Sequence, residues 1–147
     1  MIHVSRDGPI ATIALVRPEA KNALPIAAWE ALATAAAQVA DARAVLLKSD
    51  VPGIFSAGAD VREFERLQAE PELRIRFRQA MRAGIEAVAA LPMPVIAAID
   101  GGCFGAAVAL VLAADIRVAG NRAEFATTPA KLGLGYPQED IDRLMHR

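Results

Sequence analysis

The sequence predicts an α/β fold built as a single domain over residues 1–147. Short β-rich apolar runs alternate with longer segments in which apolar residues recur at helical spacing. Two glycine-rich segments, at 55–60 and 100–107, each follow an apolar run and lead into a helical pattern. No internal repeat or low-complexity linker divides the chain, and its length suits one domain with a substantial core. The alternation favours parallel strands joined by right-handed crossovers.

The first half begins with a predicted hairpin, because residues 2–4 and 10–16 are both rich in β-forming residues. Apolar residues at helical spacing then predict a helix over 26–40. The nearly continuous apolar run 44–48 predicts a strand buried on both faces. We expect residues 49–58 to form a loop.

The second half begins with a short predicted helix over 61–68, with Asp60 as its N-cap. A longer helix is predicted from Pro71 to a stop at Pro92, followed by a buried strand over 94–99. The remaining predicted elements are a helix over 106–114, strands at 115–118 and 124–126, an irregular segment at 133–137 and a short terminal helix.

Composition narrows the classes of function. A formal net charge of −1 gives no electrostatic reason to expect a nucleic acid or an anionic membrane as partner. The one cysteine excludes an internal disulfide, and no metal-ligand spacing occurs, so we expect no metal and a reducing compartment. No secretory signal pattern is present, and the uncharged stretch 101–114 is shorter than the roughly 20 residues that span a bilayer. We therefore expect a cytoplasmic protein without a nucleic-acid or membrane partner.

The two glycine-rich segments indicate carbonyl chemistry. A turn that leads from a strand into a helix leaves N–H groups without intrahelical acceptors. Two such turns that converge would form an oxyanion hole, which binds the negative charge that develops on a carbonyl oxygen. Either turn could instead serve packing alone, and this alternative stays open. Dinucleotide binding is not favoured, because the GxGxxG spacing is absent.

Several single residues are candidates for a role in the site. Asp60 and Asp115 are interpreted as capping or pairing residues, while Asp100, at the end of a predicted strand, is a candidate pocket residue. Tyr136, the only tyrosine, is either a donor to a substrate carboxylate or an aromatic at the rim. Cys103 is interpreted as a small buried residue, because no histidine or base lies near it in sequence.

Three motifs in register resemble the crotonase superfamily, also called the enoyl-CoA hydratase/isomerase family. They are RPEAKNAL at 17–24, FSAGADVREF at 55–64 and PVIAAIDGGCFGAAVALVLAADIRVA at 94–119. The resemblance implies a crotonase-like spiral of ββα units that binds an acyl-CoA thioester and stabilises its enolate with two main-chain N–H groups. Coenzyme A would enter as part of the substrate, and no separate cofactor is expected.

Matched position by position, the resemblance implies the N–H groups of Ala59 and Ala106 as the two donors. The family usually has glycine at the second position, and alanine is tolerated there because the donor is main chain. The loop around Ala20 and Lys21 would meet the adenine of CoA, and residues 59–62 would line the pantetheine and thioester. The residues so assigned to substrate binding are Ala20, Lys21, Leu24, Ala57, Asp60, Val61, Arg62, Gly105 and Thr128.

Two departures from the family pattern bear on the reaction. Hydratases of the family carry two glutamates where this chain has Ala109 and Pro129, neither of which can transfer a proton. Since general acid–base catalysis contributes roughly 10²–10⁴ in rate, hydration by the two-glutamate route is not expected. The segment 127–137 resembles methylmalonyl-CoA decarboxylase-like members, in which a tyrosine at the position of Tyr136 helps to hold a substrate carboxylate.

The resemblance also implies a C-terminal helical region, which covers the active site and builds trimers. The chain ends at Arg147, so we expect a core domain that is incomplete relative to the family. Apolar surface left exposed would favour a homo-oligomer, a trimer or hexamer in the family. Two functions remain open: an acyl-CoA enzyme of the lyase or isomerase type, and a non-catalytic remnant that binds CoA or a partner subunit.

Overall fold

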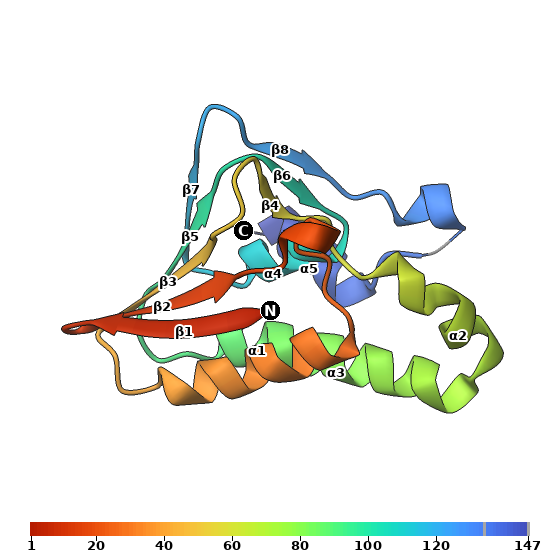
Figure 1. Cartoon of the computed structure of the whole chain (residues 1–147), viewed down its shortest axis with the longest axis horizontal. Coiled ribbons are helices and arrows are strands. Elements are labelled where there is room, and N and C mark those ends of the chain that lie inside the picture. The colour runs from red at the N-terminus through yellow and green to blue at the C-terminus, as the bar shows by residue number, and fades with distance from the viewer. Residues whose placement is uncertain (134, 147) are drawn as a thin grey trace.

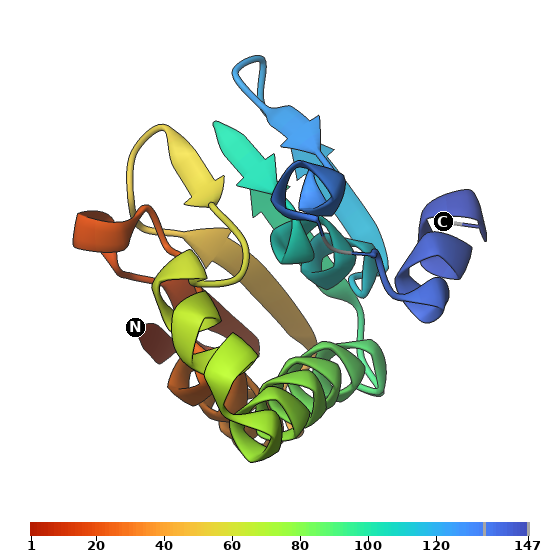
Figure 2. The same cartoon turned by 90° about the vertical axis from the view of Figure 1, so that its right-hand side faces the viewer.

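Two β-sheets and a pair of long helices make up the structure, a computed structural model that describes residues 1–133 and 135–146. Figure 1 shows the sheets meeting at an angle above the two helices, and Figure 2 shows the same arrangement from the side. Leu134, within the irregular segment predicted over 133–137, and Arg147, at the end of the predicted domain, lie outside the described residues.

The larger sheet has five strands in the order β1-β2-β3-β5-β7. The predicted hairpin pairs antiparallel, and the three following strands add in parallel. Their bounds are β1 (Ile2–Asp7), β2 (Ile10–Leu15), β3 (Ala44–Ser49), β5 (Val95–Ile99) and β7 (Ile116–Ala119). Alternate residues such as Val45 and Leu47 are fully buried, while Leu46 between them is not. The sheet therefore turns one face to the core, and the prediction that the strands over 44–48 and 94–99 are buried on both faces is wrong.

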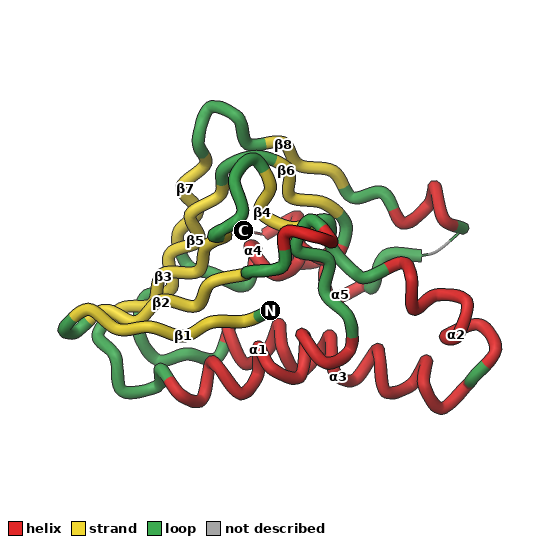
Figure 3. The backbone as a smooth tube through the Cα atoms, in the orientation of Figure 1, coloured by secondary structure: helices red, strands yellow, loops and turns green. Residues whose placement is uncertain are grey.

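The second sheet has three short parallel strands in the order β4-β6-β8. They are β4 (Ile54–Ser56), β6 (Gly102–Phe104) and β8 (Glu124–Ala126). β3, β5 and β7 of the larger sheet each lead into one of them, so that successive turns of the chain stack (Figure 3). The loop predicted over 49–58 is wrong at its end, because pairing with β6 makes residues 54–56 a strand.

Most of the helices lie where the sequence predicts them. They are α1 (Ile26–Gln38), α2 (Phe64–Ala69), α3 (Pro71–Ala89), α4 (Ala106–Leu112) and α5 (Gln138–His146), with short 3₁₀ segments η1 (Pro18–Ala20), η2 (Val61–Glu63) and η3 (Pro129–Leu132). The predicted helix over 61–68 is thus η2 followed by α2. α1 and α3 approach so closely that a Cβ on Gly84 would lie 2.9 Å from the Trp29 carbonyl oxygen.

The core lies between the two sheets and these helices. Trp29 and Leu32 from α1, Ile85 from α3 and Leu110 from α4 are fully buried. α4 is buried on nearly all sides, as its continuous apolar sequence predicts. The α/β fold class is confirmed. Within the described residues no helix is both long and apolar enough to cross a membrane.

Candidate active site

The two glycine-rich turns leave neighbouring parallel strands at the same edge of the smaller sheet. β4 leads to Gly58 and Ala59, and β6 leads to Gly105 and Ala106. A Cβ built on Gly58 would lie 2.4 Å from the Phe104 carbonyl oxygen and 3.1 Å from the Ala106 nitrogen. Gly58 also has a φ of +89°, a backbone conformation that residues other than glycine rarely adopt. Glycine at 58 is therefore what allows the two turns to touch.

The Ala59 N–H is oriented by a main-chain bridge to Leu24. The Gly58 carbonyl accepts a 2.7 Å hydrogen bond from the Leu24 N–H, and the Asp60 N–H donates to the Leu24 carbonyl at 3.1 Å. In a trans peptide the carbonyl of Gly58 and the N–H of Ala59 point in opposite directions. The Ala59 N–H thus faces away from Leu24, and no acceptor for it occurs among the hydrogen bonds of residues 1–133 and 135–146.

The Ala106 N–H opens the first turn of α4, where N–H groups have no intrahelical acceptor. Gly105 before it has φ 55° and ψ −123°, a conformation open to glycine. The Gly105 N–H donates to the Ala126 carbonyl at 2.8 Å, which ties the turn to β8. The two predicted donors, Ala59 and Ala106, therefore lie on contacting turns, and both are partly exposed.

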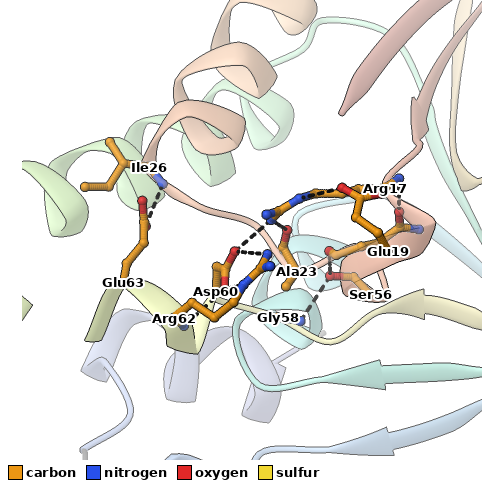
Figure 4. Close-up of polar contacts among 10 residues, drawn as sticks. Arg17, Glu19, Ala23, Ile26, Ser56, Gly58, Asp60, Arg62 and Glu63 are labelled. Atoms are coloured by element: carbon orange, nitrogen blue, oxygen red, sulfur yellow. Dashed lines mark hydrogen bonds and ion pairs between the residues drawn. The ribbon is translucent and has the colours of Figure 1, made fainter. Parts of the chain in front are cut away.

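Asp60 fixes the segment that follows Ala59 (Figure 4). Its carboxylate is 3% exposed and accepts from Arg17 Nη1 at 2.8 Å and from Arg62 Nη2 at 2.8 Å. Arg17 also donates to the Ala23 carbonyl at 2.7 Å, so it joins the segment to the loop before α1. The hydrogen bond from Arg62, then that from Arg17, hold the pKa of Asp60 far below its usual range against the opposing effect of burial. Its Oδ1 also accepts from the Arg62 N–H, which confirms the predicted cap.

Asn22 is a buried hub that sequence reasoning missed. Its Oδ1 accepts from the Arg17 N–H at 2.7 Å, and its Nδ2 donates to Ser49 Oγ at 2.8 Å and to the Phe55 carbonyl at 3.0 Å. Its own carbonyl accepts from Ser56 Oγ at 2.7 Å, and Ser56 Oγ accepts from the Gly58 N–H at 3.0 Å. The loop after β2 is thereby bonded to the ends of β3 and β4, next to Gly58.

Glu63 is a second residue that sequence reasoning missed. Its Oε2 accepts a 3.0 Å hydrogen bond from the Ile26 N–H at the start of α1 (Figure 4). The N-cap of α1 is Pro25, which offers no side-chain acceptor of its own. The sequence does show that α1 lacks a capping side chain of its own. It does not show which distant carboxylate takes that role.

The other predicted substrate-binding residues surround these turns. Ala20 ends η1, and Lys21 follows it with a left-handed φ of 51°. The Lys21 carbonyl accepts from the Ala57 N–H at 2.9 Å, so the predicted CoA loop is bonded to the segment before Ala59. Val61 and Arg62 are exposed on η2. Thr128, partly buried, precedes η3 just beyond the end of β8.

Tyr136 reaches the second turn from the far end of the chain. Its hydroxyl donates to the Gly105 carbonyl at 3.2 Å. Burial, followed by the charge of Asp140, raises the pKa of Tyr136 to about 12, so the hydroxyl stays protonated. Ala109, at the position of a family glutamate, is fully buried on α4 below this turn, and Pro129 begins η3. Neither position supplies a titratable group.

The remaining candidates are Asp100, Asp115 and Cys103. Asp100 is exposed and paired with Arg122, and Asp115 accepts from the Val95 N–H at 2.8 Å. Cys103 is fully buried, and burial raises its pKa to about 12. Asp115 and Cys103 thus match their structural interpretations. No group of three or more metal-ligating side chains is found in the described part of the chain.

Comparison with known proteins identifies the class. The family model described as enoyl-CoA hydratase/isomerase matches residues 5–146, and the chain belongs to this family. It is 39% identical over 128 residues to bovine enoyl-CoA hydratase domain-containing protein 2, mitochondrial, covering 85% of this chain and 43% of the relative. It is 41% identical over 92 residues to rat methylglutaconyl-CoA hydratase, mitochondrial, covering 63% of this chain and 29% of the relative.

Solved structures agree with this assignment. An enoyl-CoA hydratase/isomerase family protein from Hyphomonas neptunium superposes with a TM-score of 0.93 at 39% identity, covering 99% of this chain and 56% of that one. A family member from Mycobacterium abscessus gives a TM-score of 0.90 at 33% identity, covering 99% of this chain and 58% of that one. The crotonase fold predicted from the three motifs is confirmed. The chain spans about half the length of the relatives it matches.

Proposed function

We propose that the chain binds an acyl-CoA thioester and stabilises its enolate in an oxyanion hole formed by the N–H groups of Ala59 and Ala106. The observation that carries this proposal is the contact between the two turns. A Cβ added to Gly58 would lie only 3.1 Å from the Ala106 nitrogen. Each N–H belongs to a peptide whose carbonyl is already hydrogen-bonded on the opposite side. Preorganised donors of this kind are typically worth about 3–4 kcal/mol each in transition-state stabilisation.

The residues present favour decarboxylation over hydration. Water addition to a C=C bond needs a group that activates water, and Ala109 and Pro129 supply none. In decarboxylation of a malonyl-type thioester, the bond between the α-carbon and the carboxylate breaks and CO₂ leaves. The electron pair forms the enolate, whose oxygen would lie against the two N–H groups, and a proton from solvent then adds to the α-carbon. The reaction asks the protein chiefly for charge stabilisation.

A second candidate function follows from the same two positions. A chain with alanine and proline at these positions would keep the loop around Lys21 that the resemblance assigns to CoA, and it would lack the two glutamates that transfer protons. The chain would then be a non-catalytic member that binds CoA or a partner subunit. Binding with no turnover of any thioester would favour this function over the first.

The test uses titration calorimetry with acetyl-CoA and with free CoA, followed by assays of crotonyl-CoA hydration and of malonyl-CoA and methylmalonyl-CoA decarboxylation. We expect acetyl-CoA to bind more tightly than CoA, because only the thioester offers an oxygen to the two N–H groups. The Ala106→Pro variant deletes one donor at the first helical position, where proline is tolerated. It should remove the preference for acetyl-CoA while far-UV circular dichroism stays unchanged. An unchanged preference would contradict the proposed site.

A further inference from the structure

The hydroxyl of Tyr136 does not point at an empty part of the site but at a main-chain carbonyl. It donates to the Gly105 carbonyl at 3.2 Å. This carbonyl belongs to the same peptide unit as the Ala106 N–H, and the two groups point in opposite directions. A donor on the carbonyl side of a peptide fixes the plane of that peptide and polarises its N–H. Tyr136 therefore acts on the N–H from behind.

We propose that Tyr136 is a positioning residue that orients and polarises the Ala106 N–H through the Gly105 carbonyl, for every acyl-CoA that the site binds. The inference rests on the proposed oxyanion hole and adds the residue that holds its second donor. It assigns Tyr136 a role that does not depend on a second carboxylate in the substrate.

The peptide after Gly105 needs such a restraint more than its counterpart after Gly58. Both glycines have a positive φ, but Gly58 is enclosed by the Phe104 carbonyl, whereas a Cβ on Gly105 would meet nothing within 4 Å. The Gly58 carbonyl is held by the Leu24 N–H at 2.7 Å. The Gly105 carbonyl has the Val108 N–H of its own helical turn and, from elsewhere in the fold, the Tyr136 hydroxyl. Each donor peptide is thus held by a donor from elsewhere in the fold, which is main chain for the Gly58 carbonyl and a side chain for the Gly105 carbonyl.

The position of Tyr136 is itself fixed by α5, which begins two residues later. Asp140 on α5 is 1% exposed and lies 3.4 Å from guanidinium nitrogens of both Arg82 and Arg143. Arg143 also bonds Glu86 at 2.6 Å, so that two residues of α5 are tied to α3. These contacts hold the start of α5 against the molecule and keep the tyrosine over the second turn.

A tyrosine hydroxyl has one proton to donate. In this structure that proton is directed to the Gly105 carbonyl, and the hydroxyl has no second proton for a substrate carboxylate. The positioning role and the carboxylate-holding role therefore make different predictions for Tyr136→Phe. The first predicts the same loss for acetyl-CoA and malonyl-CoA, and the second predicts a loss for malonyl-CoA alone.

The experiment compares the wild-type chain, Tyr136→Phe and a matched control, Thr34→Val. Thr34 is exposed on α1 and makes a hydroxyl-to-carbonyl hydrogen bond of the same length, 3.2 Å to Glu30. The carbonyl ¹³C signal of bound [1-¹³C]acetyl-CoA reports polarisation of the thioester directly, and calorimetry gives the affinity for acetyl-CoA, malonyl-CoA and CoA. The Ala106 amide proton shift, measured without ligand, reports the hydrogen bond even where binding is weak.

We expect Tyr136→Phe to move the Ala106 amide proton upfield, to reduce the shift of the bound ¹³C carbonyl, and to weaken acetyl-CoA and malonyl-CoA alike by roughly three- to tenfold, the range of one hydrogen bond. Affinity for CoA and the behaviour of Thr34→Val should not change. A loss confined to malonyl-CoA, or an unchanged Ala106 amide in Tyr136→Phe, would overturn the inference. A wild-type chain that leaves the ¹³C carbonyl signal of acetyl-CoA unshifted would instead refute the oxyanion hole itself.

Discussion

At the scale of single residues, a few buried groups decide whether the two turns meet. Gly58 has no side chain to collide with the Phe104 carbonyl. The Asn22 and Ser56 side chains donate hydrogen bonds to main-chain carbonyls beside it. The sequence predicts the capping role of Asp60, because Asp before a helical pattern is a common N-cap. It does not predict Arg17 as the partner of Asp60, since their separation of 43 residues leaves no local signal. Local chemistry is readable from sequence, and partnership across the fold is not.

The close approach at Gly58 makes this position far less tolerant than other glycines with positive φ. Gly53 has φ +74° and would meet nothing within 4 Å, so Gly53→Ala isolates the backbone effect, about 1–2 kcal/mol. We expect Gly58→Ala to lose clearly more stability, because the added methyl group also overlaps the Phe104 carbonyl, and to bind acetyl-CoA no better than CoA. Urea denaturation and calorimetry check both points. Equal stability of the two variants would contradict the contact.

The ionised state of Asp60 makes part of the stability depend on pH. Its pKa in the folded state lies far below the value near 4 expected in the unfolded chain. The stabilisation is therefore fully present above about pH 5 and is lost as pH falls toward the folded pKa. We expect the free energy of unfolding of Asp60→Asn to fall less steeply than that of the wild type between about pH 5 and 2. Urea denaturation as a function of pH measures these slopes, and parallel slopes would be inconsistent with an ionised Asp60.

The pKa of Asp140 is shifted in the opposite direction to that of Asp60. Burial raises its pKa despite the nearby Arg82 and Arg143, whose contacts are long at 3.4 Å. A raised folded pKa contributes stability that is present below the unfolded pKa and is lost as pH rises through the folded pKa. Asp140→Asn should therefore change the pH slope in the direction opposite to that of Asp60→Asn.

At the scale of secondary structure, the long and periodic elements are predicted and the short ones are not. The helix predicted over 26–40 and the strand predicted over 44–48 match α1 and β3 within two residues. β4 and β6 have three residues each, and β6 contains Gly102, so neither shows a β pattern. They are strands because β4 pairs with β6 and β6 pairs with β8. These are the strands that bring Ala59 and Ala106 together, so the site depends on the part of the fold with the weakest local signal.

Glu63 lies on η2 and caps the start of α1, so its replacement should lower the stability of the protein. Glu63→Ala removes the acceptor for the Ile26 N–H at the start of α1, and loss of a cap costs about 1 kcal/mol. Glu63→Gln keeps an acceptor oxygen and should recover most of this loss. The exposed Glu65→Ala on α2 serves as the control. Thermal unfolding measures the effect, and equal transition temperatures for Glu63→Ala and Glu65→Ala would contradict the cap.

At the scale of the whole molecule, none of the helices in the described residues covers the outer face of the larger sheet (Figure 1). In register across it lie Leu46, Ile96 and Ile116, and Ile116 on the edge strand β7 is 51% exposed. Two cavities of about 510 and 490 Å³ open on this face and share Lys48 and Asp50. An apolar face that ends in an unpaired edge strand favours pairing with another chain. We therefore expect the homo-oligomer predicted from the sequence to form through this face.

Self-association through this face can be distinguished experimentally from non-specific association of exposed apolar residues. We expect Ile116→Lys to lower the sedimentation coefficient at high protein concentration, because a lysine on the edge strand opposes pairing. Ile75→Lys is the matched control, since Ile75 is 55% exposed on α3, away from the sheet edge. Sedimentation velocity over a range of concentrations is the measurement. A monomeric wild type, or the same decrease in both variants, would count against this surface.

The burial of Cys103 has a practical consequence for all of these assays. With its thiol enclosed and its pKa near 12, the only cysteine of the chain has almost no thiolate at neutral pH. A chromogenic disulfide reagent added to the folded protein should therefore remain colourless until free coenzyme A is released. Any colour with a thioester would signal hydrolysis, and a silent reaction that evolves CO₂ would signal decarboxylation, without the need to mutate or block the protein.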